Sequence, residues 1–230
     1  MAVVRRIPCV VREVTDHGER VYTVVLEPSI PVPTFKPGQF LHLALDSYQG
    51  DGFWPESRVF SVASSPSERH RLEITYAVKG PFTSRMEREL AVGRPAWVKL
   101  PYGEFVIDPT RDTVLFAGGT GITAFTAFLQ SLEPGQSPRV ALFYGARTHD
   151  LFVYGPLVEA CARLVPSLVV DLVCEATDGR LQVEPAWPKI AALEDPAFYL
   201  SGPPPMLAAL TDQLHRYGVA AANISIDAWD

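Results

Sequence analysis

The pattern of apolar residues changes near Asp108 and Pro109, and this change restricts the fold more than any other feature of the sequence. Before it, short runs rich in valine, isoleucine and aromatic residues are separated by turn signals, which is typical of an antiparallel barrel or sandwich. After it, strand-like and helix-like runs alternate, which predicts a parallel, doubly wound sheet. We therefore expect two domains, residues 1–108 and residues 109–230.

The N-terminal domain is expected to consist mostly of strands. They are predicted at residues 3–14, 20–26, 40–45, 58–62, 71–77 and 96–100. A single helix is predicted over residues 83–90, with Thr83 or Ser84 as its N-cap. The C-terminal domain is expected to have strands at 114–117, 140–144, 168–174, 197–200 and 224–228 and helices at 122–132, 154–164 and 206–217.

Composition excludes several classes of protein. The 230 residues are 47% hydrophobic, which suffices for a well-buried core, and their net charge of −6 argues against nucleic-acid binding. No apolar run approaches the roughly 18 residues of a membrane span, and the first residues lack the apolar core of a signal peptide. Cys9, Cys161 and Cys174 are widely separated, so we expect no disulfide framework, no four-cysteine iron–sulfur cluster, no metal site and a cytoplasmic location.

Two turns in the C-terminal half join a predicted strand to a predicted helix. The first, Gly118-Gly119-Thr120-Gly121, would let a ligand approach the backbone and would place an anion at a helix start. Its order differs from the G-x-G-x-x-G dinucleotide fingerprint, and a tight turn without a ligand is the alternative. The second, residues 201–206, reads SGPPPM and would face the same sheet edge, although prolines at a helix start also explain it.

A third segment, Arg58 to Ser64, reads RVFSVAS. Its alternation predicts a strand, yet it begins with an arginine and carries two serines among small apolar residues. By itself the segment is compatible with a surface ion pair on a solvated edge strand. The arginine and serines alone therefore assign no ligand.

Taken together, seven segments resemble the ferredoxin–NADP reductase superfamily, whose flavin motif has the form Arg-x-Tyr/Phe-Ser-x-x-Ser. They are KPGQF at 36–40 with RVFSVAS, GPFTS at 80–84, PYGEF at 101–105, LFAGGTGI at 115–122, YGART at 144–148 and YLSGPPPM at 199–206. The resemblance covers nearly the whole chain, in the order and spacing of the family. It implies a flavin-binding antiparallel β-barrel followed by an α/β doubly wound domain that binds NAD(P).

The resemblance also assigns roles. Arg58 would contact the flavin pyrophosphate, Phe60 would pack against the flavin, and Ser61 would lie near flavin N5. Ser61, Ser201, Asp227 and Trp229 are the candidate catalytic residues. The candidate cofactor-binding residues are Arg58, Val59, Phe60, Ser61, Tyr76, Val78, Gly80, Phe82, Thr83, Ser84, Gly119, Thr120, Gly121, Ile122, Arg147, Gly202, Pro203, Met206 and Trp229.

Four positions need comment against the family pattern. Phe60 stands where the family often has tyrosine, and Ser201 stands where well-known members have cysteine before Gly-Pro. Many members have an acid and an aromatic residue near the chain end, as Asp227 and Trp229 are here. Trp229 would then stack on the flavin, and the alternative is that it packs in the core as part of the last strand.

The nucleotide is expected to be NADH. Family members that use the 2′-phosphate have serine or arginine past the third strand of this domain, whereas Glu175 and Asp178 here would repel a phosphate. Arg147 and Arg180 argue partly for NADPH.

The expected function is that of a flavin-dependent NAD(P)H oxidoreductase. Hydride would pass from NAD(P)H to N5 of FAD, with FMN as the alternative flavin, and electrons would continue to a separate acceptor. That acceptor could be an iron–sulfur protein or free flavin. A non-catalytic flavin-binding electron-transfer or regulatory subunit of a larger complex is the other interpretation.

Overall fold

A computed structural model describes residues 3–50, 52–135 and 138–227. The chain divides into two compact units, Met1–Val106 and Ile107–Asp230. The domain boundary expected from the sequence lies two residues beyond this division. In the part of the chain that the structure describes, no helix is long and apolar enough to cross a membrane.

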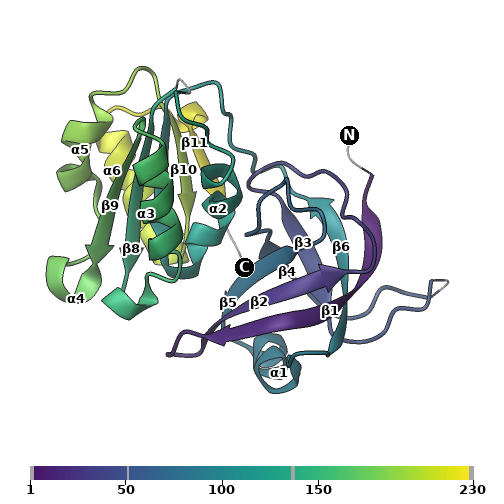
Figure 1. Ribbon diagram of the computed structural model, residues 1–230. Helices are drawn as coiled ribbons and strands as arrows, with labels where there is room; N and C mark the ends of the chain where they lie inside the picture. The colour runs from purple at the N-terminus through teal and green to yellow at the C-terminus, as the bar shows by residue number, and fades with distance from the viewer. Residues whose placement is uncertain (1–2, 51, 136–137, 228–230) are drawn as a thin grey trace. The chain divides into compact units, whose positions relative to one another are not determined.

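The N-terminal unit is a nearly closed antiparallel barrel, which confirms the predicted fold class. Its strands are β1 (Arg5–Asp16), β2 (Val21–Pro28), β3 (Phe40–Ala44), β4 (Ser57–Ser61), β5 (Leu72–Ala77) and β6 (Pro95–Tyr102), in the order β4-β3-β6-β1-β2-β5 (Figure 1). The two end strands, β4 and β5, approach each other, and the amide of Ala63 donates to the carbonyl of Glu73 at 2.8 Å. We call the gap between β4 and β5 the seam.

The helix α1 (Pro81–Glu89) follows β5, and its N-cap is Gly80. The predicted N-cap, Thr83 or Ser84, was therefore wrong by about one turn. Proline is suited to the first helical position because its fixed φ matches the helix and its missing N–H has no partner to lose. Pro81 therefore allows the helix to begin earlier than the hydroxyl residues suggested.

The C-terminal unit contains the predicted parallel sheet. Its strands are β7 (Thr113–Gly118), β8 (Val140–Ala146), β9 (Leu168–Cys174), β10 (Ala197–Ser201) and β11 (Ile224–Asp227), in the order β11-β10-β7-β8-β9. The helices are α2 (Thr123–Leu129), α3 (Gly155–Leu164), α4 (Glu175–Asp178), α5 (Val183–Ile190) and α6 (Pro204–Arg216), with short 3₁₀ turns η1 (Gly119–Ile122), η2 (His149–Leu151) and η3 (Ala221–Asn223).

Helices cover both faces of this sheet, as the doubly wound class requires. Figure 1 shows α3 across one face, and α5 and α6 pack against the other. On that second face, Phe116 and Phe143 stack with ring centroids 5.1 Å apart, beside Leu207 and Leu210 of α6. The alternating side chains of β7 thus bury both of its faces, as expected for a central parallel strand.

One helical prediction in this unit needs correction, and the helices α4 and α5 were not predicted. The helix predicted over 122–132 begins with the η1 turn and continues as α2, which ends at Leu129. The helix α5 was not predicted, because Pro188 lies inside it and proline normally interrupts helices. The strand predicted to reach residue 228 is described only as far as Asp227.

The amino ends of the strands are joined by Asp112, which is buried. Its carboxylate accepts hydrogen bonds from the Arg139 amide at 2.8 Å, the Arg139 guanidinium at 2.6 Å and the Glu194 amide at 2.9 Å. These donors come from the residue before β8 and from the loop before β10. Burial acts to raise the pKa of Asp112, but the donors outweigh it and hold that pKa below its usual value.

Candidate functional site

Arg58 and the start of α1 come together at the seam. The Arg58 guanidinium carbon lies 5.2 Å from the ring centroid of Phe82, the second residue of α1. Phe60, two residues along β4, meets Tyr76 of β5 edge to face with centroids 6.2 Å apart. Four of the predicted cofactor-binding side chains, from three elements, therefore form one continuous surface.

The backbone at the start of α1 is available to an anion. The first helical hydrogen bond runs from the Ser84 amide to the Gly80 carbonyl at 2.9 Å, so the amides of Phe82 and Thr83 precede it. Such amides, together with the helix dipole and an adjacent guanidinium, favour phosphate oxygens. A Cβ built on Gly80 would have no atom within 4 Å, so the space in front of this turn is open.

The Thr83 hydroxyl has a different place from the one predicted for it. It accepts from the Lys79 and Gly80 amides at 2.9 and 3.1 Å, and it donates to the Gly80 carbonyl at 3.1 Å. A hydroxyl has one proton and two lone pairs, so all of its capacity is used inside the turn. Thr83 therefore shapes the turn with its side chain and can offer a ligand its amide.

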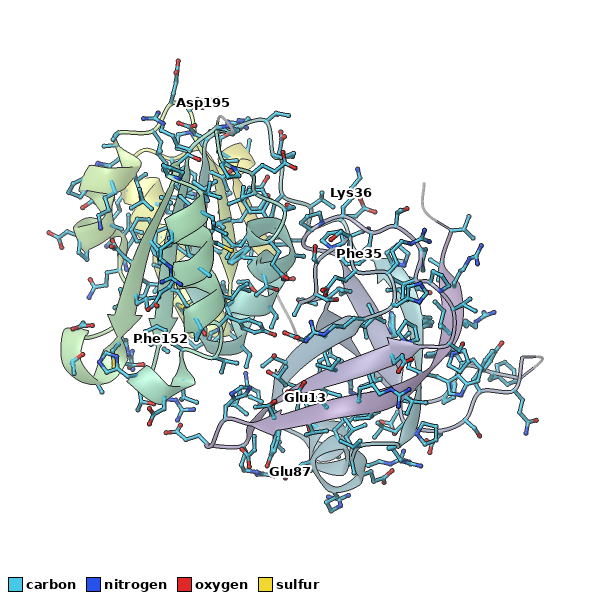
Figure 2. All side chains as sticks on the ribbon, viewed as in Figure 1. Glu13, Phe35, Lys36, Glu87, Phe152 and Asp195 are labelled. Atoms are coloured by element: carbon cyan, nitrogen blue, oxygen red, sulfur yellow. The ribbon has the colours of Figure 1, made fainter. Side chains whose placement is uncertain are left out.

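Three further residues that the sequence did not single out support this surface. Tyr22 of β2 stacks on Tyr76 with centroids 5.5 Å apart and donates its hydroxyl to Glu87 at 3.1 Å. Arg20 also pairs with Glu87, at 2.6 Å, and Figure 2 shows Glu87 on α1. Burial raises the pKa of the Tyr76 hydroxyl above its usual value, which keeps it protonated. The Tyr22–Tyr76 register was visible only after strands β2 and β5 were paired.

In the C-terminal unit, two glycine turns interlock at the carboxyl ends of β7 and β10. These strands are neighbours, with Ala117 opposite Ser201. A Cβ on Gly121 would lie 2.7 Å from the Gly202 nitrogen and closer still to the Ser201 carbonyl oxygen. A Cβ on Gly118 would collide with the Met206 thioether. The turn at 118–121 and the turn at 201–206 therefore pack as one body.

Gly119 is different, because it faces open space. Its φ is +53°, and a Cβ there would have no atom within 4 Å. This backbone conformation favours glycine, but no neighbouring protein atom would clash with a larger side chain at this position. This combination suits a ligand that lies directly against the peptide.

Ser201 and Asp227 meet beside these turns. They are register partners on β10 and β11, and the Ser201 hydroxyl donates to the Asp227 carboxylate at 2.9 Å. Both side chains are buried. Two of the four predicted catalytic residues are thus brought into direct contact at the same sheet edge as Gly121. Trp229 lies outside the described residues.

Comparison with known proteins gives a consistent family. Residues 115–212 match the family described as the oxidoreductase NAD-binding domain. The reductase component of phenol 2-monooxygenase from Pseudomonas sp. (strain CF600) is 30% identical over 79% of this chain and 54% of its own length. A flavohemoprotein from Rhizobium meliloti (strain 1021) is 27% identical over 94% of this chain and 58% of its own length. The chain thus spans a little over half the length of these curated relatives.

Solved structures show the same two-unit architecture. A ferredoxin reductase in carbazole 1,9a-dioxygenase aligns with a TM-score of 0.77 and 25% identity, covering 99% of this chain and 70% of that one. In its two-unit fold and its NAD-binding segment, the chain resembles the ferredoxin–NADP reductase superfamily. The FAD/NAD-binding domain of a nitric oxide dioxygenase from Vibrio cholerae O1 biovar El Tor shares the fold, with a TM-score of 0.80 at 21% identity over 97% of this chain and 98% of that one.

Other residues expected from the superfamily pattern have mixed surroundings. Ser61 is buried opposite Phe40, and Val59 lies opposite His42. The Val78 amide donates to the Arg20 carbonyl at 3.0 Å, and Ile122 is fully buried. The remaining predicted residues lie in or beside the interlocked turns or the turn after β8. They are Thr120 in η1, Arg147 after β8, and Gly202, Pro203 and Met206 around the start of α6.

The two acids that were predicted to select the superfamily's nucleotide are not equivalent. Asp178 accepts from the Cys174 amide at 2.9 Å and from the Thr177 hydroxyl at 3.1 Å, so it closes the turn after β9. Glu175 instead pairs with Arg180 at 3.0 Å on the surface. Glu175 neutralises Arg180 and is therefore the better candidate for repelling a phosphate. Asp178 is used inside its own turn.

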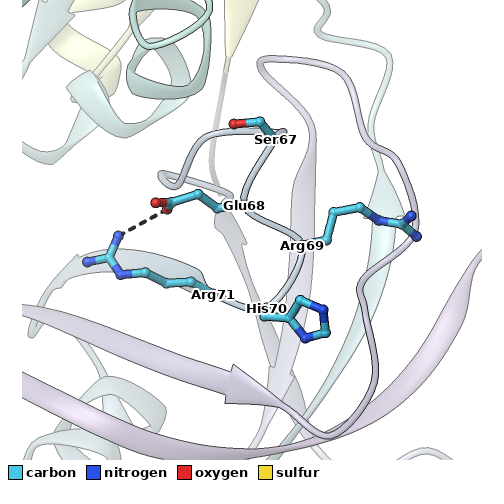
Figure 3. A pocket seen from close by; sticks show the side chains of 5 residues that line it. All are labelled: Ser67, Glu68, Arg69, His70 and Arg71. Carbon is cyan, nitrogen blue, oxygen red and sulfur yellow. Dashed lines mark ion pairs between the residues drawn. The ribbon is translucent and has the colours of Figure 1, made fainter.

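A shallow depression elsewhere on the barrel is lined by none of the predicted residues. It has a volume of about 320 Å³ and is lined by Ser67 to Arg71 (Figure 3). Arg69 donates to the Val32 carbonyl at 2.8 Å, while Arg71 pairs with Glu68 and Glu73 at 3.5 and 2.5 Å. The hydrogen bond of Arg69 and the ion pairs of Arg71 hold the loop between β4 and β5 in place.

Proposed function

We propose that this protein is a flavin-dependent NAD(P)H oxidoreductase that passes electrons to a separate acceptor. The observation that carries the proposal is that one chain contains two open, anion-favouring backbone turns, each beside predicted cofactor residues. One turn lies at Gly80 beside Arg58, and the other lies at Gly119 beside the Ser201–Asp227 pair. The names of the relatives, which are reductase components and flavohemoproteins, support the same activity.

The residues at the seam fit FAD. Arg58 and the amides of Phe82 and Thr83 would hold the pyrophosphate, because charge-assisted hydrogen bonds suit phosphate oxygens. Phe60 and Tyr76 would offer ring surfaces to the flavin and help to exclude water. When bound, a flavin supplies the chemistry that accepts hydride and releases electrons. The chain itself binds and orients the reactants.

The residues at the sheet edge fit NAD(P)H. Gly119 would allow the nucleotide pyrophosphate to lie against the backbone. Ser201, whose proton is directed to Asp227, would present its oxygen lone pairs to the nicotinamide. The hydroxyl is held in one orientation by a buried carboxylate, which restricts the geometry of the bound ring.

NADH is the proposed nucleotide, and a protein is the proposed acceptor. Glu175 pairs with Arg180, the cation that would otherwise attract a 2′-phosphate. The negative charge of Glu175 is itself unfavourable to a phosphate. The choice of a protein acceptor follows the reductase components among the relatives. An iron–sulfur protein and free flavin are the two acceptors to compare in a screen.

Arg58→Ala tests the flavin site. Charged hydrogen bonds are worth roughly 1.5–3 kcal/mol, so flavin affinity should fall about ten- to a hundredfold. The purified variant should be pale and should recover activity when FAD is added. Arg12→Ala is the control, since Arg12 is an exposed arginine paired with Glu27 on the same barrel. A fully yellow Arg58→Ala protein with unchanged flavin affinity contradicts the assignment.

Anaerobic mixing with NADH separates the enzyme from a non-catalytic subunit. The flavin absorbance of the wild-type protein should bleach in the stopped-flow instrument, and it should do so faster with NADH than with NADPH. A yellow protein that neither nucleotide bleaches would instead be the electron-transfer or regulatory subunit.

A further inference from the structure

Three basic side chains form a row across the barrel. The register places Arg6 of β1 opposite Lys99 of β6, and Lys99 opposite His42 of β3. The adjacent residues Ile7, Val98 and Leu43 are fully buried, so the row lies on the outward face. Like charges directly across a sheet destabilise it. We call Arg6, His42 and Lys99 the basic row.

Aromatic rings, not carboxylates, surround the basic row. The Lys99 ammonium lies 5.1 Å from the ring centroid of Trp54 and 5.6 Å from that of Tyr102, and the Arg6 guanidinium carbon lies 5.4 Å from that of Tyr48. Among residues 3–50, 52–135 and 138–227, no carboxylate forms an ion pair with a member of the row. By contrast, six other arginines of this barrel pair with acids: Arg12, Arg20, Arg58, Arg71, Arg85 and Arg94.

Two acids of the loop between β3 and β4 are committed to other arginines, and the third, Asp51, lies outside the described residues. The loop between β3 and β4 is bounded by Asp46, which pairs with Arg85 at 2.5 Å, and by Glu56, which pairs with Arg58 at 3.1 Å. Burial lowers the pKa of Lys99, and Arg6 adds to that effect; burial likewise lowers the pKa of His42, with a contribution from Lys99. The row is therefore partly desolvated, and its two cations, Arg6 and Lys99, repel each other, while the lowered pKa keeps His42 neutral near pH 7.

The loop between β3 and β4 supplies an apolar margin. It extends away from the barrel strands (Figure 1), and Phe53 within it is fully exposed. Trp54 donates its indole N–H to the Ser57 hydroxyl at 3.0 Å. The ring centroid of Tyr48 lies 5.4 Å from that of Trp54 and 5.5 Å from that of Trp97. Aromatic side chains held in place beside cations resemble the composition of protein interfaces.

We propose that the basic row and the rings around it form a docking surface for a protein partner that presents a cluster of carboxylates. Charge complementarity selects this partner, because acids would satisfy a repelling row that has none of its own in the described chain. Single-stranded nucleic acid fits less well. Its bases need free ring faces, whereas Trp54, Tyr102 and Tyr48 already carry the protein's own cations, and the protein is acidic overall.

An oligoglutamate peptide can stand in for the acidic partner. Binding to the full-length protein at low ionic strength would be followed by tryptophan fluorescence, since Trp54 and Trp97 are two of the chain's four tryptophans. An oligoglutamine peptide of equal length and an oligothymidylate are the comparison ligands. The wild-type protein should bind oligoglutamate best, and added salt should weaken that binding.

Variants locate the interaction. Lys99→Gln and, separately, Arg6→Gln should each weaken oligoglutamate binding about tenfold. Arg163→Gln removes one exposed cation from α3 and is the matched control for net charge. Arg6 is exposed near the start of β1, so its variant remains informative if Lys99→Gln does not fold.

Three results overturn the proposal. The first is oligoglutamate binding that falls equally in Arg163→Gln and in the row variants, or that is absent from the wild-type protein. The second is tighter binding of oligothymidylate than of oligoglutamate. The third is a wild-type dimer that Lys99→Gln dissociates in sedimentation, because the occupant would then be a second copy of the chain.

Discussion

At the amino ends of β7 and β8, the buried carboxylate of Asp112 receives donors from three groups of the surrounding backbone and side chains. At the carboxyl ends of β7 and β10, the glycine turns press against each other, while Gly119 faces open space. At the first end, these donors are bonded to a buried carboxylate, whereas at the second end closely packed turns lie next to an open space. The amino ends of the strands therefore stabilise the sheet, and the carboxyl ends leave room for a ligand, as is usual in doubly wound folds.

The largest effect should come from breaking the crowded part of the carboxyl edge. Gly121→Ala places a Cβ against backbone atoms of residues 201 and 202, which cannot rotate away as a side chain could. We expect a loss of about 3 kcal/mol or more, and a fall in Tm of about 6–12 °C. Thermal unfolding followed by circular dichroism measures it. Gly155→Ala is the control, since its Cβ would meet only Phe152 at 3.4 Å. Equal melting of the two variants would contradict the interlocked packing.

The next effect tests the amino edge. Asp112→Asn should cost about 2 kcal/mol, less than for a fully buried ion pair because Arg139 is half exposed. The folded-state pKa of Asp112 is lowered, so its contribution is present above the ordinary aspartate pKa of about 3.9 and is lost as pH falls through the folded-state value. The stability difference between wild type and variant should thus be constant near neutrality and shrink in acid.

Denaturant titration at a series of pH values measures this difference. Asp195→Asn is the control, because Asp195 forms an exposed pair with Arg111 and should contribute little. A gap between wild type and Asp112→Asn that widens in acid would have the wrong sign for the proposed role.

A smaller effect is expected at the Ser201–Asp227 pair. Ser201→Ala removes one buried donor to the carboxylate and should cost about 1–2 kcal/mol. If the hydroxyl also orients the nicotinamide, kcat with NADH should fall in this variant, whereas Ser201→Cys should retain part of it. Ser225→Ala, on the exposed side of β11, is the control for both measurements. A variant that melts lower yet keeps full kcat would limit the pair to a structural role.

The smallest effect concerns the surface acid near the carboxyl edge. Glu175→Gln should free Arg180 and raise the ratio of kcat/KM for NADPH over NADH about fivefold, with no measurable change in Tm because the pair is exposed. Glu159→Gln, in the exposed Glu159–Arg163 pair of α3, is the control. An unchanged ratio would shift attention to Arg147.

Sequence patterns predicted the strands of both units well, because alternation and short apolar runs follow directly from burial on one or two sheet faces. They failed where a tertiary contact or a proline decided the outcome. The α5 helix tolerates Pro188 because its buried residues Val183, Ala186 and Ile190 pack on the sheet. The N-cap shifted to Gly80 because Pro81 suits a helix start better than the hydroxyl residues that follow.

The motifs of the candidate site could be predicted from the sequence. Which of their residues serve packing and which face a ligand could not. The spacing of GGTG does not reveal that Gly118 and Gly121 serve packing while Gly119 faces an opening. Asp178 looked like a ligand-facing acid, but it caps its own turn. Tyr22 lies far from any motif, and Glu87 follows GPFTS on α1; their contact depends on strand pairing and on the position of α1. Each of these assignments depends on which segments meet in space.

The seam has a practical consequence for anyone who handles the protein. Between β4 and β5, the described residues show no continuous ladder of backbone hydrogen bonds, only an approach near Ala63 and Glu73. A cofactor bound there would contact both strands and hold them together. At a free cofactor concentration of a hundred times Kd, binding would stabilise the folded state by about 2.7 kcal/mol. Preparations that have lost it during purification should therefore be nicked first by proteases in the barrel, and the yield of intact protein should depend on how much FAD the buffers contain.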